Sequence, residues 1–472
     1  MMSRAEVEGS SVPGQGVAWT KHLIEQDILT HSRALMELPL ALLKNLGRIG
    51  VDSCFPVQAH VIPEVLSSTH SPLLMCVGGE IPPDIMVCAP TGCGKTLAYV
   101  VPIVAALMTR VVPQVRALVV VPSQELASQV HQVFLSLTHG TQLKAGLLSE
   151  EATLIDPTYY PLASSMDILI TTPVQLTHYI DRGSLPCLRY LVLDEADRLL
   201  QASQCQWLPK LMASRTSHTS PLSTTLHTLS SLPHVHDPLH PLMVQPVKQV
   251  CVQKLLFSAT MTFDPEHLSV LRLNRPLLFC VSDADSAFTL PTRLEEVLVK
   301  CGVGKKPLVL LHLLSQSPAA LCFTNTRDTA HRLVLLLREL GLVTVAEMTG
   351  AISSSKRREV LEDFRRGRTK VLVCTDAMAR GMDLPNINTV INYDPPRTFG
   401  MYLHRAGRTA RAGQRGVVNT LLSPDEVHPF KTMLRKVVKK TISNITVSQD
   451  DLRPYDEQYR IALDKLQSNT LQ

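Results

Sequence analysis

The feature that most constrains this chain is an alternation of short apolar runs with helical patterns, which occurs in two series. The first series has strand-like runs at residues 84–90, 117–122, 167–173, 190–197 and 254–260. The second series begins at residue 307 and ends near residue 396. Apolar strands that alternate with helices are typical of a parallel sheet covered on both faces. We therefore predict an α/β protein with two tandem domains separated by a cleft, a place where ligands commonly bind.

Changes in composition predict the limits of these domains. Residues 1–20 are polar and predict a leader without regular structure, and a helix is expected between residues 35 and 51, where Pro39 limits its start. We place the first domain at residues 21–285, the second at 286–445 and a polar tail at 446–472, in which residues 457–466 (EQYRIALDKL) form one amphipathic stretch. A connecting region between the two series is expected near residues 278–292. Residues 213–250 are rich in Ser, Thr, His and Pro, which indicates a surface insertion. Its histidines are better explained as exposed loop residues than as metal ligands.

Charge and cysteine usage limit the environment but do not identify a partner. The net charge of +5 permits a polyanion partner without establishing one. The 11 cysteines form no CxxC pair, and several lie in apolar stretches, among them Cys88, Cys251, Cys322 and Cys374. This pattern favours buried, reduced thiols over a metal site. The N-terminus has no apolar signal region and no run reaches membrane-spanning length, so we expect a soluble, intracellular protein without a membrane partner.

The segment 89–96 (APTGCGKT) ends a predicted strand and opens a predicted helix. Backbone N–H groups of such a loop, together with the helix N-terminus, form a cradle for phosphate oxygens. Lys95 would reach the β- and γ-phosphates, and Thr96 would hold Mg²⁺ through its hydroxyl. Ala89 stands where the usual pattern has glycine. We interpret the segment as a nucleotide phosphate site.

Four residues with three carboxylates, Asp194-Glu-Ala-Asp197, follow another predicted strand. A carboxylate at the end of a neighbouring parallel strand lies near the phosphate loop, so Asp194 is expected to bind Mg²⁺, partly through water. Glu195 is placed to orient or deprotonate the attacking water. An acidic patch that opens a helix more often acts as a cap when it stands alone. Here the phosphate loop and the acidic segment support each other.

These motifs, with seven others, resemble the DEAD-box RNA helicases over roughly residues 55–423. The additional motifs are FPVQ at 55–58, PSQEL at 122–126, TTP at 171–173, SAT at 258–260, FTNT at 323–326, TDAMARGMD at 375–383 and HRAGRTAR at 404–411. The resemblance implies two RecA-like domains, with the cofactors ATP and Mg²⁺ and with RNA as a partner. The implied activity is ATP-dependent RNA helicase or RNA-dependent ATPase.

The resemblance also assigns roles to individual residues. It implies that Gln58 reads the adenine edge and Asp383 touches the ribose, while Arg408 and Arg411 act as arginine fingers on the γ-phosphate. His404 and Arg405 open the same motif and are expected to support the interface between the domains. The implied phosphate loop is Ala89, Pro90, Thr91, Gly92, Cys93, Gly94, Lys95 and Thr96, and the implied coupling residues are Ser258, Thr260, Asp197 and His404. The implied RNA contacts are Pro122, Ser123, Glu125, Thr172, Pro173, Thr324, Asn325, Arg327, Arg357, Thr375, Arg380 and Gly381.

The sequence departs from the family pattern on the expected RNA face. Ser123-Gln124 replaces Thr-Arg, Val174-Gln175 replaces Gly-Arg, and residues 149–151 (SEE) replace paired glycines. In the second domain Ser354 stands where a Gln is usual. Each lost phosphate contact should reduce the log–log salt slope of single-strand binding by about 0.7. We therefore expect weak intrinsic RNA affinity and weak unwinding by the isolated chain.

An extra segment at residues 67–84, the phrase VDSCFPVQ at 51–58 and WLPKL at 207–211 resemble the helicase fifty-one branch of the family. That resemblance implies a nucleolar protein that acts in rRNA processing and large ribosomal subunit biogenesis, with ribosomal RNA or its precursor as partner. A protein activator or another component of the assembly particle is a further partner that it allows.

Two alternatives to a remodelling helicase stay open at this point. One is a slow-turnover ATP-gated RNA clamp or scaffold, which the altered RNA contacts motivate. The other is a DNA-directed motor, which the family resemblance disfavours because family contacts to the 2′-OH select RNA.

Overall fold

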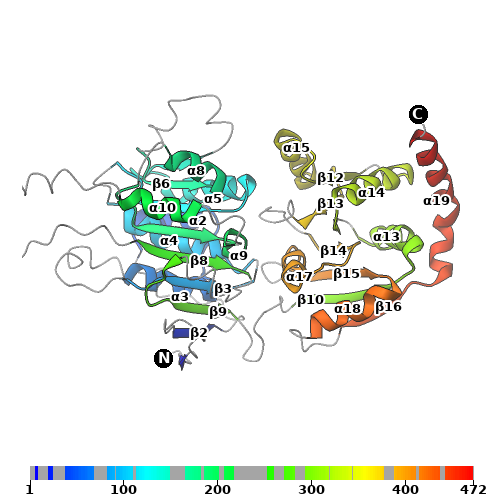
Figure 1. Cartoon of the computed structure of the whole chain (residues 1–472), viewed down its shortest axis with the longest axis horizontal. Helices are drawn as coiled ribbons and strands as arrows, with labels where there is room; N and C mark the ends of the chain where they lie inside the picture. The colour runs from blue at the N-terminus through cyan, green and yellow to red at the C-terminus, as the bar shows by residue number, and fades with distance from the viewer. Residues whose placement is uncertain are drawn as a thin grey trace, which may run out of the picture. The chain divides into compact units, whose positions relative to one another are not determined.

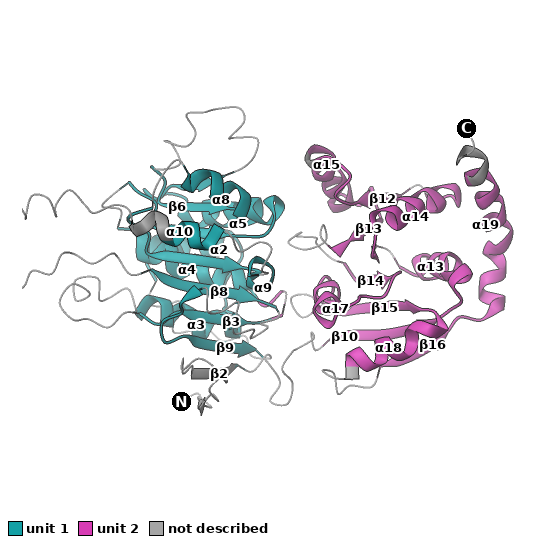
Figure 2. Ribbon diagram, in the orientation of Figure 1, with its two compact units in different colours: residues 1–89, 94–281 teal, residues 90–93, 282–472 magenta. Residues whose placement is uncertain are grey.

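The structure is a computed structural model that divides into two compact units (Figure 2). One unit comprises residues 1–89 and 94–281, and the other comprises residues 90–93 and 282–472. The division after residue 281 lies close to the boundary that we placed after residue 285. The described residues are 6–8, 20–24, 38–67, 82–90, 92–109, 113–148, 165–181, 185–200, 207–216, 252–259, 271–281, 293–317, 319–342, 344–376, 387–410, 414–435 and 442–470.

The first unit is built on a nine-stranded sheet in the order β1-β2-β9-β3-β8-β7-β4-β6-β5 (Figure 1). All neighbouring pairs are parallel except β1 with β2. The strands are β1 (Glu6–Glu8), β2 (Thr20–Ile24), β3 (Ile85–Cys88), β4 (Ala117–Val120), β5 (Ala145–Leu147), β6 (Ile168–Thr171), β7 (Tyr190–Asp194), β8 (Gln253–Ser258) and β9 (Leu277–Val281). The helices are α2 (Leu40–Arg48), α3 (Pro56–Ser67), α4 (Lys95–Leu107), α5 (Gln124–Thr138), α8 (Pro173–Ile180), α9 (Ala196–Leu199) and α10 (Trp207–Thr216).

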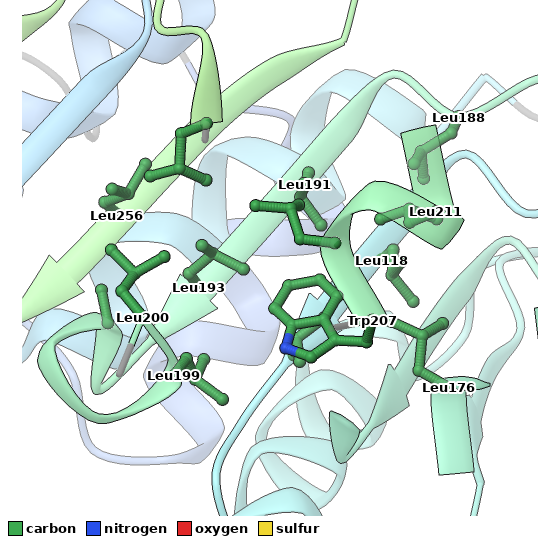
Figure 3. Packing of buried hydrophobic residues seen from close by; sticks show 14 of the residues in the cluster. Leu118, Leu176, Leu188, Leu191, Leu193, Leu199, Leu200, Trp207, Leu211 and Leu256 are labelled. Atoms are coloured by element: carbon green, nitrogen blue, oxygen red, sulfur yellow. The ribbon is translucent and has the colours of Figure 1, made fainter. Parts of the chain in front are cut away.

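Helices pack on both faces of this sheet because its central strands are apolar on both sides. Every residue of β3, β4, β6, β7 and β8 is buried. On one face, Trp207 of α10 packs among leucines such as Leu176, Leu191 and Leu199, which come from α8, β7 and α9 (Figure 3). Helices α2, α3, α4 and α5 form a second group that pack against one another.

The second unit is built on a seven-stranded, all-parallel sheet in the order β12-β13-β11-β14-β15-β10-β16. Helices α13, α14 and α19 pack on one side of it, and α15, α17 and α18 on the other. The strands are β10 (Leu294–Lys300), β11 (Ala320–Thr324), β12 (Val345–Met348), β13 (Val371–Thr375), β14 (Thr389–Asn392), β15 (Gly416–Leu422) and β16 (Ser443–Thr446). The helices are α13 (Lys306–Ser315), α14 (Arg327–Glu339), α15 (Ser354–Arg365), α17 (Phe399–Ala406), α18 (Pro424–Arg435) and α19 (Gln449–Thr470), with a 3₁₀ turn at Val303–Lys305. The predicted fold of parallel sheets covered on both faces is thus confirmed in both units.

The expected polar tail is instead an integral helix of the second unit. Helix α19 packs on α13 and α14, and Leu452, Tyr455 and Tyr459 join the apolar cluster between these helices and the sheet. The polar residues that dominate its composition lie on its outer side, and the buried positions recur at helical spacing. The sequence-based boundary at residue 446 was therefore wrong, because a mostly polar helix can still bury one narrow stripe.

Three further expectations need correction. Strand β1 and the first residue of β2 lie inside the segment that we predicted as an irregular leader, where β1 covers the edge that β2 would otherwise leave open. Residues 278–281, which we assigned to a connection, belong to β9, which pairs with β2 and β3. Helix α10 extends to Thr216 and so includes the start of the predicted 213–250 insertion. Residues 217–250 of that insertion lie outside the described part of the chain.

The described residues test the expectation of buried thiols at three of the four cysteines named above. Cys88, Cys322 and Cys374 are buried free thiols, as expected, whereas Cys251 lies outside the described residues. Among the described helices, none is both long enough and apolar enough to cross a bilayer.

We predict that Leu452→Ala lowers the free energy of unfolding of the second unit by about 2–4 kcal/mol, because it empties a buried leucine site. Leu452 is 5% exposed. Denaturant unfolding followed by far-UV circular dichroism measures this change. Tryptophan fluorescence should report no shift, since Trp19 and Trp207, the two tryptophans, both belong to the first unit.

Ile461→Ala is the matched control, because Ile461 lies on the same helix but is 49% exposed. It should change stability by no more than a few tenths of a kcal/mol, as surface substitutions usually do within about 0.5 kcal/mol. Equal effects of the two substitutions would mean that α19 is not docked through Leu452.

Candidate nucleotide and nucleic-acid sites

Parallel pairing places three separate sequence motifs at one edge of the first sheet. Strands β3, β8 and β7 are neighbours, with Cys88 paired to Ser258 and Asp194 paired to Phe257. The phosphate loop follows β3, the SAT motif closes β8, and the acidic segment follows β7. The carboxyl ends of parallel strands are where α/β folds bind ligands. Each motif thus reaches this edge at the end of a buried strand.

The phosphate loop is shaped by two glycines in the left-handed region. Gly92 has φ +89° and Gly94 has φ +73°, conformations that residues with a Cβ adopt only at a cost. A Cβ at Gly94 would also collide with the side-chain amide of Gln58. Helix α4 begins directly afterwards at Lys95, whose Nζ donates a hydrogen bond to the Ala89 carbonyl at 2.6 Å. The loop therefore curls back on itself ahead of a helix N-terminus, as a phosphate cradle requires.

Gln58 is held against this loop. Its side chain is 2% exposed, its Nε2 donates to the Gly94 carbonyl at 3.0 Å, and its Oε1 accepts from the Phe55 N–H at 2.9 Å. The expected adenine-reading amide is thus engaged with the protein itself. Ala89 is buried, Pro90 and Cys93 are half-buried, and Gly92 is exposed.

Asp194 is a buried carboxylate at the end of β7. Its Oδ2 accepts a hydrogen bond from the Tyr99 hydroxyl at 2.9 Å, and its Oδ1 accepts from the Glu195 N–H at 3.0 Å. Burial raises the pKa of Asp194 to about 6, while the nearby Lys95 ammonium opposes that rise. A carboxylate in this setting gains from a cation beside it, because burial makes an unpaired charge costly.

Glu195 and Asp197 have different tasks in the local geometry. Glu195 is half-buried with φ +54°, a left-handed conformation that is costly for a residue with a side chain. Such strain concentrates at functional sites, and here it turns the chain sharply between β7 and α9. Asp197 instead accepts a hydrogen bond of 2.8 Å from the Ser258 hydroxyl, and Ser258 is fully buried. This bond joins two of the expected coupling residues.

The donor set at this edge fits Mg²⁺. No group of three or more His, Cys, Asp or Glu gathers within the described ranges, so they contain no protein cage for a metal. Mg²⁺ does not need one, because it is usually held by one or two side chains, waters and substrate phosphates. Asp194 and Thr96 offer a carboxylate and a hydroxyl, and Asp194 accepts a hydrogen bond from Tyr99, which lies three residues after Thr96 on α4.

Two of the three altered segments of the first unit also lie side by side at this sheet edge. Ser123-Gln124 follows β4 and Val174-Gln175 follows β6, its neighbour in the sheet, whereas residues 149–151 lie outside the described residues. Ser123 caps α5 by accepting from the Leu126 N–H at 3.3 Å, and Gln124 points its amide to the Leu148 carbonyl at 3.5 Å. Pro122 and Glu125 are half-buried at the same helix start.

The start of helix α8, like that of α5, directly follows a strand at this edge of the sheet. Thr172 precedes the helix, Pro173 is its first residue, and both follow β6. Val174 is 60% exposed and Gln175 is buried. The family pattern has glycine at the exposed position 174 and arginine at the buried position 175. This chain has an apolar residue at the first position and an uncharged amide at the second.

In the second unit, Arg405 is the hub of a buried network. It is 1% exposed and pairs with Asp376 through Nε and Nη2, at 2.6 and 2.7 Å. Its remaining bonds reach Asn325 Oδ1 at 2.9 Å, Asn392 Oδ1 at 3.2 Å and the Asp394 carbonyl at 2.7 Å, and its guanidinium lies 5.1 Å from the Phe323 ring centre. Arg405 therefore supports its own unit from inside, and its expected role at the interface between the domains stays a prediction.

Several residues that are expected to contact RNA lie in or beside this network. Thr324 is fully buried, and the Asn325 side chain is engaged at both ends, because its Nδ2 also donates to the Pro395 carbonyl at 3.1 Å. Thr375 is buried at the end of the neighbouring strand β13. Arg327 is exposed and lies against Gly350, and Arg357 is half-buried on α15. The two arginines are thus placed closer to solvent than the threonines and the asparagine.

Of the remaining expected site residues, two are buried in the second unit and six lie outside the described residues. His404 and Arg408 are each 4% exposed, and the Nε of Arg408 donates to the His404 carbonyl at 3.3 Å. Thr91, Thr260, Arg380, Gly381, Asp383 and Arg411 lie outside the described residues.

Tyr99 was missed from the sequence although a signal for it existed. It lies three residues after Thr96 on a predicted helix, and residues at that spacing share one face. A buried tyrosine also usually finds a hydrogen-bond partner for its hydroxyl.

Comparison with known proteins agrees with this geometry. Residues 55–268 match the DEAD/DEAH box helicase family, and residues 305–413 match the helicase conserved C-terminal domain. The S. cerevisiae structure described as Dbp5 bound to RNA and ADP BeF3 has a TM-score of 0.65 at 21% identity, and covers 92% of this chain and 99% of that chain. That likeness supports the fold alone.

Two relatives carry the comparison further. ATP-dependent RNA helicase DDX51 of Danio rerio is 39% identical over 468 residues, which are 94% of this chain and 71% of the relative. ATP-dependent RNA helicase DDX51 of Homo sapiens is 38% identical over 460 residues, which are 90% of this chain and 67% of the relative. Because this likeness extends through both units, the chain belongs to the DEAD-box ATP-dependent RNA helicases of the DDX51 type.

Proposed function

We propose that this chain remodels short RNA duplexes or RNA–protein complexes in rRNA processing and large ribosomal subunit biogenesis, with turnover of ATP. The observation that carries the proposal is the single edge of the first sheet, where the phosphate loop, Asp194 and Glu195 lie beside the expected RNA segments. One edge can then connect nucleotide chemistry to a nucleic-acid strand. The branch-specific segments at 51–58, 67–84 and 207–211 support the ribosomal assignment and a nucleolar location.

The chemistry assigns one task to each group. Lys95 and the backbone N–H groups of the loop hold the β- and γ-phosphates, and Glu195 orients the attacking water and takes its proton. Asp194 and Thr96 would hold Mg²⁺, which when bound would neutralise charge on the phosphates. The family resemblance assigns Asp383 to the ribose and Arg408 and Arg411 to charge on the transferred phosphoryl group.

A slow ATP-gated RNA clamp is the second candidate, and one observation favours it. The Gln124 amide faces the Leu148 carbonyl, and Val174 presents an apolar surface where the family has Gly. An edge with fewer cationic contacts would hold RNA weakly on its own and would need a partner. The two candidates differ in turnover, because a clamp hydrolyses little ATP even when RNA is bound.

We predict that Glu195→Gln lowers ATP hydrolysis in the presence of single-stranded RNA by about 10²–10⁴-fold, the usual contribution of a positioned acid–base group. The amide keeps the size of the side chain but cannot accept the proton. Steady-state phosphate release measures the loss, and binding of a fluorescent ATP analogue shows whether the nucleotide site is intact.

Glu64→Gln is the matched control, since Glu64 is half-buried on α3 of the same unit and belongs to no motif. It should leave phosphate release unchanged. Residual hydrolysis of the Glu195→Gln variant close to that of the wild type would remove Glu195 from the proposed chemistry.

We also predict that Gln124→Arg strengthens binding of single-stranded RNA and steepens its log–log salt dependence by about 0.7, the value for one added phosphate contact. Gln124 lies at the start of α5, at the edge where the family places an arginine. Fluorescence anisotropy of a labelled RNA oligonucleotide over a series of KCl concentrations measures both quantities.

Gln132→Arg provides the same change of charge at an exposed position two turns further along α5. It should raise affinity less and leave the slope nearly unchanged. Identical slopes for the two variants would show that the start of α5 does not contact the RNA backbone.

A further inference from the structure

The hydroxyl of Tyr99 bonds one of the two side chains that are proposed to hold Mg²⁺ and lies near the other. It donates to Asp194 Oδ2 at 2.9 Å, and Thr96 precedes Tyr99 by three residues on the same face of α4. Tyr99 is fully buried, and its ring packs on Phe257 of β8 with the ring centres 5.0 Å apart. The residue therefore touches the phosphate-loop helix, the strand of the acidic segment and the strand of the SAT motif.

The direction of these hydrogen bonds follows from the chemistry of the groups. An ionised carboxylate only accepts, so the Tyr99 proton points to Asp194. The lone pairs of the Tyr99 oxygen are then left to accept a proton. A threonine hydroxyl that binds a cation must direct its lone pairs to the metal and its proton away from it. The Tyr99 oxygen, one helical turn further along α4, can accept that proton.

We propose that Tyr99 is a positioning residue that holds Thr96 and Asp194 in the orientation that binds Mg²⁺ with the nucleotide. This inference rests on the proposed nucleotide site and adds to it a residue that would itself touch neither metal nor nucleotide. Groups that hydrogen-bond the ligands of a metal typically change its affinity about 10–100-fold when they are removed.

The ring and the hydroxyl of Tyr99 can be separated experimentally. Tyr99→Phe keeps the contact with Phe257 and removes only the hydroxyl oxygen, which bonds Asp194 and can accept from Thr96. Tyr190→Phe is the matched control, because Tyr190 is also buried, lies on β7 at the end away from Asp194, and loses the same atom.

The test measures the affinity of a fluorescent ADP analogue for the full-length chain, once in excess Mg²⁺ and once in EDTA. We expect the wild type to bind more tightly with Mg²⁺, and Tyr99→Phe to lose about tenfold of that gain while its affinity in EDTA is unchanged. Tyr190→Phe should match the wild type under both conditions.

Each other outcome has a definite meaning. If Tyr99→Phe keeps the full Mg²⁺ gain, or loses affinity equally in Mg²⁺ and EDTA, the positioning role is wrong and the proposed nucleotide site stands. If the wild type itself gains no affinity from Mg²⁺, both the site and the inference are overturned.

Discussion

The parallel ladder that joins β3, β8 and β7 is the constraint on which the rest of the structure depends. It brings together the phosphate loop, Ser258 and Asp194, which are widely separated in the sequence. Parallel strands need a crossover between them, and here the crossovers are helices that bury the sheet on both faces. Burial then raises the pKa of Asp194 and favours a cation beside it. Fold and chemistry therefore share a cause, because the same apolar strands that form the core bring the charged ends to one edge.

That edge divides into two parts with different properties. At the ends of β3, β8 and β7, the side chains support one another through Lys95, Tyr99, Asp194 and the pair of Ser258 with Asp197. At the ends of β4 and β6, the Gln124 amide bonds to the Leu148 carbonyl, and Val174 presents an apolar side chain where the family has glycine. Nucleotide chemistry is thus supported more completely than RNA contact. In the second unit, Arg405 organises the corresponding strand ends from inside the core.

Sequence reasoning found most of the fold because buried parallel strands are continuous apolar runs, and it found the motifs because each lies at a strand end. It failed where polar residues are buried in pairs. The strand β10 contains Glu296, which accepts a hydrogen bond from the buried Tyr402 hydroxyl. The strand β15 contains Thr420, which accepts from Asn392 at 3.0 Å. Each pair satisfies a polar group that breaks the apolar pattern of its strand, and no local pattern reveals its partner. Tyr99 was missed partly for the same reason: its spacing from Thr96 is visible in the sequence, but its bond to Asp194, far along the chain, is not.

We infer that this helicase combines intact ATP chemistry with a weakened hold on RNA. Steady-state ATP hydrolysis by the wild-type chain, measured against the concentration of single-stranded RNA, tests both properties at once. We expect clear stimulation that saturates only at high RNA concentration, because turnover is intact and binding is weak. Hydrolysis that stays near background when binding measurements show the RNA to be saturating would rule out intact turnover and favour the clamp. Half-saturation at low RNA concentration would contradict the weakened RNA contact.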